Sequence, residues 1–172
     1  MRIRRRSGGG AIATRERSAQ APLTASLLPA VAFPQRLASN LRHGGERVVN
    51  RLLIILLNTD PRNVEELGAP FYHAAVAASM DYEVDVVCTA TAGRLMIKGV
   101  AERLRVKPNS PMTVYDWIKE AHGQGARFWA CPANLELFDA NKSDLIPECN
   151  GLMGAATMIQ DLMDGECRVL TY

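Results

Sequence analysis

The sequence lacks a long apolar run and a paired-cysteine motif. No stretch approaches the roughly 20 consecutive apolar residues that a membrane-spanning helix needs, and the longest run, residues 52–57, has the length of a buried strand. No two of the four cysteines are spaced as in a CxxC motif. A framework of disulfide bonds is also unexpected, because such frameworks are typical of shorter, secreted chains. We therefore expect reduced thiols in a cytoplasmic protein with no membrane partner.

Signatures of nucleotide and metal chemistry are also missing. No Walker motif and no GxGxxG pattern follows the first apolar run, so the sequence does not support a nucleotide cofactor. Neither His73 nor His122 has the spacing to another His or Cys that metal sites use. We expect neither a metal nor an organic cofactor.

Charge is distributed unevenly along the 172 residues. The first 51 residues contain ten Arg, no Lys and only two acids, Glu16 and Glu46, which is a balance of +8. The remaining residues hold ten basic and sixteen acidic side chains, a balance of −6, so that the whole chain carries +2. Because the folded part is expected to be acidic, the sequence does not indicate a nucleic-acid-binding face.

Residues 1–47 have the composition of a disordered basic extension. They are rich in Arg, Ser, Ala, Gly and Pro, and they cannot bury enough apolar surface to order themselves. Two interpretations are equally open: an organellar transit peptide, which would direct the protein to an organelle, or an over-extended start of the chain. A secretory signal fits less well, because Pro29 interrupts the apolar stretch at 25–33. Residues 48–172 form the predicted domain.

Strands and helices alternate along this domain. Apolar patterns predict strands at 52–57, Glu83–Cys88, 126–130, 144–149 and 167–171. Helical spacing predicts helices at 70–80, near 95–104, after Thr113, and through Leu152, Ala156, Ile159 and Met163. This alternation is typical of an α/β fold with three layers, α/β/α, built around a mostly parallel open sheet of about five strands.

The helix after Thr113 carries a clear start signal. Asp116 lies three residues after Thr113, and this spacing makes a variant of the capping box. The apolar face that follows at helical spacing consists of Val114, Trp117, Ile118 and Ala121. The pattern therefore predicts an amphipathic helix that begins at this cap.

Cys131 has the most informative local surroundings. It follows a strand-like run and precedes Pro132 and a helix-compatible stretch, 133–138. Proline is favoured in the first turn of a helix, so the pattern predicts that Cys131 is the N-cap. A thiolate there would face unpaired backbone N–H groups and the positive end of a helix dipole, which both favour the anion. The alternative is a small buried apolar residue, the commoner fate of a free cysteine.

Three of the four cysteines are predicted to share one edge of the sheet. Right-handed crossovers bring the carboxyl ends of parallel strands to the same edge, where ligands bind in such folds. Cys88, Cys131 and Cys149 each end a predicted strand, whereas Cys167 begins one and should lie at the opposite edge. Cys149 and Cys88 are therefore candidate accessory thiols, with simple packing as the alternative for both.

Other residues near this edge are candidates for ligand contact: Asn58, Asp60, Pro132, Gly151 and Gly154. The simpler role of Asp60 is to cap the turn at Pro61. The two glycines precede the last helix and could admit a small anion through backbone N–H groups, although Gly-x-x-Gly is a weak signal.

Two short motifs carry a resemblance to a known family. The first is FWACPANLELF at residues 128–138, followed by KSDLIP at 142–147, and the second is GLMGAAT at 151–157. In these motifs, and in the turn NTDP at 58–61 with the helix after it, the chain resembles the DsrE/DsrF-like family of sulfur-relay proteins. The resemblance spans residues 51–172.

The resemblance implies a role for Cys131. The cysteine at this place in the DsrE/DsrF-like family accepts a persulfide sulfur and passes it on, without a metal or an organic cofactor. Some relatives carry a second cysteine in the following helix, where this chain has Leu135 and no thiol, so a single carrier thiol is implied. The resemblance also implies sulfur donor and acceptor proteins as partners, and a homo-oligomer, either a trimer or a hexamer.

The sequence therefore predicts a sulfur carrier that holds a persulfide on Cys131. Whether it counts as an enzyme, a sulfurtransferase, stays open because a carrier is regenerated by its partners. Two alternatives remain. One is a ligand-binding or regulatory oligomer of the same fold without sulfur chemistry. The other is a thiol peroxidase, which is disfavoured because no Thr or Arg is placed by sequence to activate a peroxide.

Overall fold

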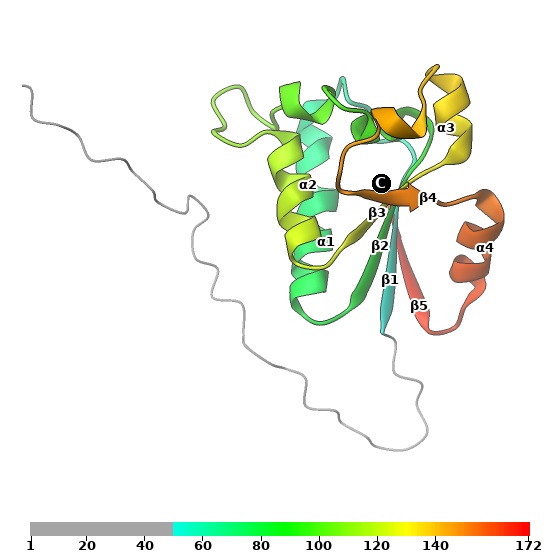
Figure 1. Cartoon of the computed structure of the whole chain (residues 1–172). Helices are drawn as coiled ribbons and strands as arrows, with labels where there is room; N and C mark the ends of the chain where they lie inside the picture. Colours follow the sequence, from blue (N-terminus) through cyan, green and yellow to red (C-terminus); the bar gives the residue numbers. More distant parts are fainter. Residues whose placement is uncertain (1–49) are drawn as a thin grey trace, which may run out of the picture. The chain divides into compact units, whose positions relative to one another are not determined.

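The computed structural model describes residues 50–172, which form a five-stranded sheet (Figure 1). The strands are β1 (Arg51–Leu56), β2 (Glu83–Cys88), β3 (Arg127–Ala130), β4 (Cys149–Leu152) and β5 (Cys167–Thr171). They lie in the order β4-β3-β2-β1-β5, and every neighbouring pair is parallel. The predicted α/β fold with about five strands is confirmed. The predicted extension, residues 1–47, lies outside the described residues.

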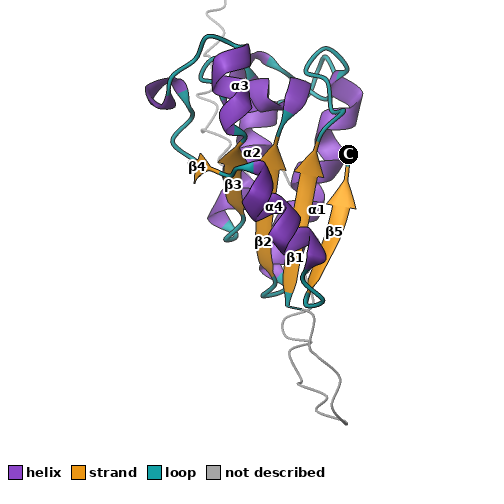
Figure 2. Ribbon diagram, turned by 90° about the vertical axis from the view of Figure 1, so that its right-hand side faces the viewer, coloured by secondary structure: helices purple, strands orange, loops and turns teal. Residues whose placement is uncertain are grey.

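Helices cover both faces of the sheet. They are α1 (Gly68–Ser79), α2 (Val114–Gly123), α3 (Pro132–Leu137) and α4 (Ala155–Met163), with short 3-10 turns η1 (Val64–Leu67), η2 (Ala90–Met96), η3 (Ala101–Arg103) and η4 (Lys142–Asp144). Helices α1 and α2 pack together on one face and α4 lies on the other, which gives the predicted three layers (Figures 1 and 2). None of these described helices has the length and apolar character that crossing a membrane requires.

Strand β1 shows how the sequence pattern produces the layers. It lies between β2 and β5, and its last four residues are buried because helices cover both faces of the sheet. Ile54 and Leu56 belong to the apolar cluster under α1 and α2, whereas Leu53 and Ile55 belong to the cluster under α4. The carboxyl ends of all five strands point the same way and form one functional edge (Figure 2).

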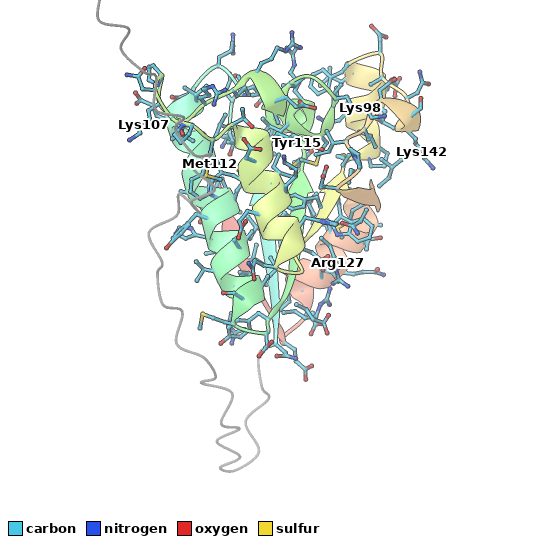
Figure 3. The ribbon with its side chains drawn as sticks, turned by 60° about the vertical axis from the view of Figure 1, so that its left-hand side comes forward. Lys98, Lys107, Met112, Tyr115, Arg127 and Lys142 are labelled. Carbon is cyan, nitrogen blue, oxygen red and sulfur yellow. The ribbon has the colours of Figure 1, made fainter. Side chains whose placement is uncertain are left out.

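Charged side chains hold the opposite, amino end of the sheet. Asp85 in β2 is buried, and its carboxylate accepts hydrogen bonds from the Arg127 guanidinium at 2.8 and 2.7 Å and from the Trp129 indole at 2.7 Å. Figure 3 shows Arg127, the first residue of β3, below Lys98 and Lys142. These hydrogen bonds compensate the buried negative charge of the Asp85 carboxylate. This charge therefore does not lie at the carboxyl edge of the sheet.

The capping box predicted for α2 is present. The Thr113 hydroxyl accepts a hydrogen bond from the Asp116 N–H at 3.1 Å, and the Asp116 carboxylate accepts one from the Thr113 N–H at 2.8 Å. Partial burial opposes ionisation of Asp116, but the hydrogen bonds from Thr113 and Lys119 outweigh it and lower the pKa of Asp116 to about 2. The predicted apolar face packs on the sheet through Val114, Ile118 and Ala121, with Trp117 half-buried.

Removing this capping box is expected to destabilise the domain. Thr113→Ala should lower the free energy of unfolding by about 1 kcal/mol at neutral pH. Because the pKa of Asp116 is lower in the folded state, its stabilising contribution is complete above about pH 4 and is lost as the pH falls toward 2. The difference in unfolding free energy between wild type and Asp116→Asn, measured with urea, should shrink over this range. A constant difference would contradict the assignment.

Residues 95–104, predicted to be helical, do not form an α-helix. The chain makes two 3-10 turns, η2 and η3, which are separated at Ile97. Ile97 is extended and forms an isolated bridge with Leu145 in the segment before β4. Gly99 then adopts a φ of +80°, outside the helical region. Tertiary pairing therefore overrides the helical spacing of the sequence.

The strand predicted at 144–149 lies further along the chain, as β4. The residues before β4 pair with η2 instead of the sheet, as shown by Ile146, whose N–H donates to the Met96 carbonyl at 2.9 Å. Cys149 consequently begins a strand and does not end one. Leu152, predicted to lie in the last helix, ends β4, because α4 starts only after the N-cap at Gly154.

Candidate functional site

Cys131 lies where β3 meets α3, at the carboxyl edge of the sheet. Its backbone is extended, with φ −72° and ψ 132°, and Pro132 takes the first helical position. The Cys131 N–H donates to the Cys88 carbonyl at 3.2 Å, and the Cys131 carbonyl accepts from the Asn134 N–H at 2.9 Å. The side chain is half-exposed and makes no capping hydrogen bond. The predicted order of strand, N-cap and helix is confirmed.

Asn134 fastens α3 to the turn that follows β2. It is only 4% exposed, and its side-chain amide donates to the Ala90 carbonyl at 2.5 Å. Ala90 has a φ of +47°, which is uncommon for a residue other than glycine. Gly93 leaves room for the amide, because a Cβ there would lie 1.8 Å from the Asn134 Nδ2. This contact fixes the geometry between the strand ends that carry Cys88 and Cys131.

Cys88 and Cys149 pack inside the domain. Cys88 is the last residue of β2 and is fully buried, and burial, with a smaller effect of nearby Cys149, raises the pKa of its thiol. Burial also raises the pKa of Cys149, whose Sγ donates to the Gly151 carbonyl at 3.3 Å. Both side chains contact the apolar cluster under α1 and α2. Their surroundings are those of packed, neutral thiols.

Cys167 lies at the other edge, as predicted. It begins β5 and is paired in register with Arg51, the first residue of β1. The side chain is buried, and burial raises the pKa of its thiol although Arg51 partly offsets this effect. Cys167 therefore takes no part in the carboxyl edge.

Asp60 is engaged in its own turn at the end of β1. Its carboxylate accepts hydrogen bonds from the Arg62 guanidinium at 2.6 Å and from the Arg62 backbone N–H at 2.8 Å. These bonds lower the pKa of Asp60 to about 2. The backbone N–H of Asn58 donates to the Tyr172 carbonyl at 3.1 Å and so joins the ends of β1 and β5. Both residues thus have structural partners at this edge.

Arg94 places a positive charge at the same edge. It is exposed on η2, the turn that also holds Ala90, and its guanidinium lies 4.7 Å from the centre of the Phe138 ring at the end of α3. After Arg62, Arg94 also contributes to the low pKa of Asp60. Nothing in the sequence pattern marks an isolated arginine in a turn, so sequence reasoning missed it. Sequence reasoning also missed Asn134, whose only signal in the sequence is its position three residues after Cys131.

The two glycines occupy different environments. Gly151 lies in β4 opposite Trp129 with a φ of +149°, and a Cβ there would lie 3.5 Å from the indole ring. Gly154 is the N-cap of α4 and follows Met153, whose N–H donates to the Ala130 carbonyl at 3.0 Å. Gly151 is part of strand β4, so of these two glycines only Gly154 lies at the start of a helix.

The chemistry available at this edge is that of a single thiol. Within residues 50–172, no group of three or more His, Cys, Asp or Glu side chains is arranged to hold a metal ion. His73 instead contacts the Tyr172 hydroxyl through its Nδ1 atom. Cys131 is half-exposed at the start of a helix, a position in which a cysteine can act as a nucleophile.

Comparison with known proteins finds a family to which part of the chain is similar. The model of the DsrE/DsrF/DrsH-like family matches residues 90–170, which include η2, Cys131 and α4. No curated protein matches the chain. Two solved structures share the fold: the protein of unknown function MTH1491 from Methanobacterium thermoautotrophicum and the ychN protein from E. coli.

The two structural likenesses extend over most of this chain. MTH1491 is 16% identical with a TM-score of 0.51, and the match covers 71% of this chain and 98% of that one. The ychN protein is 15% identical with a TM-score of 0.53, and the match covers 71% of this chain and 99% of that one. At such identities the likeness shows the fold alone. Together with the match at residues 90–170, it means that the domain is similar to the DsrE/DsrF/DrsH-like family in that part of its sequence and in its fold.

Proposed function

We propose that the protein is a sulfur carrier that holds a persulfide on Cys131 and passes it between partner proteins. The observation that supports this most is the position of the thiol. Cys131 stands at the carboxyl edge of the sheet and belongs to neither apolar cluster, whereas Cys88, Cys149 and Cys167 all pack against one. The similarity of residues 90–170 to a family linked to sulfur relay supports the same chemistry.

The proposed reaction moves one sulfur atom without net oxidation. The Cys131 thiolate attacks the terminal sulfur of a donor persulfide, R–S–SH, so that a new S–S bond forms on Cys131 while the donor S–S bond breaks. The donor leaves as the thiolate R–S⁻, and Cys131 becomes Cys–S–SH. An acceptor thiolate then attacks the terminal sulfur of Cys131 in the same way and regenerates the carrier thiolate.

The surroundings of Cys131 suit this exchange. A donor and an acceptor protein must both reach the sulfur, which a half-exposed side chain at the start of α3 permits. The clamp between Asn134 and Ala90 keeps α3 and η2 in one arrangement during both steps.

Protein-bound sulfur tests the proposal. After incubation with a small-molecule persulfide and gel filtration, cyanide should release as thiocyanate roughly one sulfur atom per wild-type chain. Cys149→Ser, the matched control, should load equally, and Cys131→Ser should lose the loading. A small acceptor thiol should discharge the loaded wild type.

Other outcomes would favour the alternatives. Wild-type protein that takes up no sulfur would support a ligand-binding or regulatory oligomer of the same fold. Rapid consumption of hydrogen peroxide that depends on Cys131 would support a thiol peroxidase. Equal loading of wild type and Cys131→Ser would reject Cys131 as the carrier.

A further inference from the structure

An apolar groove lies between helix α1 and strand β5. Its volume is about 530 Å³, within the range of pockets that hold small molecules. The groove exists because α1 packs on β1 and β2, while the helix that contacts β5, α4, lies on the opposite face of the sheet (Figure 1). One face of β5, the edge strand, is therefore left without a covering helix in the described domain.

Two regular rows of side chains form the walls of this groove. Along β5 the lining residues alternate with Cys167 and Val169, which pack in the cluster under α4. The lining residues of β5 are Arg168, Leu170 and Tyr172. Along α1 the lining residues follow helical spacing, and they are His73, Val76, Ala77 and Met80. Both walls are thus largely apolar, and Met80 and Leu170 leave apolar surface open to solvent.

One end of the groove carries an available positive charge. No Asp or Glu is among the described residues that line the groove, although the domain as a whole is acidic. Arg51 is engaged on the other face of the sheet, where it pairs with Asp161 at 3.1 Å. Arg168 is exposed, donates to the Gly165 carbonyl at 3.2 Å, and forms no ion pair within the described part of the chain. Its guanidinium is therefore free to bind an anion.

The other end carries polar groups that already have partners. The Tyr172 hydroxyl contacts the Nδ1 atom of His73, and burial raises the pKa of Tyr172, so that its hydroxyl stays protonated at neutral pH. From Arg168 to Tyr172 the strand rises by about 13 Å. The groove therefore offers one cationic end and an apolar length of this order.

We propose that the groove binds a carboxylate with an unbranched apolar chain, such as a fatty acid of medium length. The carboxylate accepts hydrogen bonds from the Arg168 guanidinium, and the chain lies along Leu52, Val76 and Leu170. Strands β1 and β2 lie between β5 and β3, which leads to Cys131. The inference therefore goes beyond the proposed function and does not rest on sulfur chemistry.

Isothermal titration calorimetry with decanoate tests the site in the full chain. Decanoate should bind one to one, with a binding heat that becomes more negative as the temperature rises, because apolar surface is buried. Octanoate, whose chain is two methylene groups shorter, should bind roughly tenfold more weakly. Decyltrimethylammonium has a similar chain and the opposite charge. It should bind at least about tenfold more weakly, because the hydrogen bonds to the guanidinium are lost.

A pair of arginine variants tests the charged end. Arg168→Gln should weaken decanoate binding about tenfold and leave the binding of decyltrimethylammonium unchanged. Arg103→Gln is the matched control, because Arg103 is also exposed and donates to a backbone carbonyl, that of Gly99, but does not line the groove. This control should bind decanoate as the wild type does.

Filling the groove should abolish binding. Ala77→Trp places a large side chain in it from α1, and Leu170→Glu places a carboxylate in it from β5. Either variant serves if the other loses its structure by circular dichroism. Ile159→Glu, at an apolar position on α4 that is 51% exposed, is the control for Leu170→Glu and should keep wild-type binding.

Three results would each overturn the proposal. The first is a wild type that shows no saturable binding of decanoate. The second is equal affinity of the wild type for decanoate and decyltrimethylammonium, which would deny a role to Arg168. The third is undiminished decanoate binding by a folded Ala77→Trp or Leu170→Glu variant, which would place the ligand elsewhere.

Discussion

Replacing Gly93 by alanine is expected to lower the free energy of unfolding by about 3 kcal/mol, at the upper end of overpacking effects. The new Cβ would lie 1.8 Å from the Nδ2, 2.4 Å from the Cγ and 3.0 Å from the Cβ of Asn134. Rotating the amide away would not relieve the contact with the Asn134 Cβ. It would also leave a buried amide without its bond to Ala90, which carries a further cost. Helix α3 must therefore move relative to η2.

Gly123→Ala provides the control for this prediction. Gly123 is the last residue of α2, and a Cβ there would meet no atom within 4 Å. Its replacement should leave stability unchanged or raise it by up to about 1 kcal/mol, because alanine is the better helix former. Adding Asn134→Ala to Gly93→Ala should recover part of the loss, since the clash disappears with the amide. If Gly93→Ala were as stable toward urea as the wild type, the contact between Gly93 and Asn134 would not hold α3 in place.

Iodoacetamide is expected to modify Cys131 alone in the folded protein. The reagent attacks thiolates that it can reach, and Cys131 is half-exposed at the edge. Cys88 is fully buried and burial raises the pKa of its thiol, so it should react far more slowly than Cys131. Burial raises the pKa of Cys149 and Cys167 as well, which also slows their modification.

Unfolding in urea supplies the reference for this selectivity. All four thiols should then react at similar rates, because the burial that separates them is gone. Modification of Cys149 in the folded protein as fast as that of Cys131 would contradict the packed environment described for it. Such a result would return Cys149 to the role of an accessory thiol.

The parts of the fold that follow local rules were predictable from sequence. The continuous apolar run of β1 indicated an inner strand, and Thr113 with Asp116 located the start of α2 because a capping box is a contact between near neighbours. The position of Cys131 as an N-cap followed in the same way from a strand pattern and Pro132. Each of these signals lies within a few residues of the element that it specifies.

The parts that depend on distant contacts were not predictable. Residues 95–104 carry helical spacing, yet Ile97 pairs with Leu145, nearly fifty positions away, and this pairing breaks the helix. The Asn134 amide and the space above Gly93 meet only after α3 folds onto η2. The amphipathic pattern of α4 was visible, but a pattern does not say which side faces the sheet. In the structure Asp161 pairs with Arg51 of β1, and the apolar side chains Ile159 and Met163 are exposed.

Peptide-level mass spectrometry tests the central proposal most directly. Wild type and Cys131→Ser are treated with a small-molecule persulfide, the terminal sulfur is trapped by alkylation, and the protein is digested. The peptide that contains Cys131 should carry one added sulfur atom, and Cys131→Ser should carry none on any cysteine. Added sulfur on the Cys149 or Cys88 peptide, with Cys131 unmodified, would contradict the proposal.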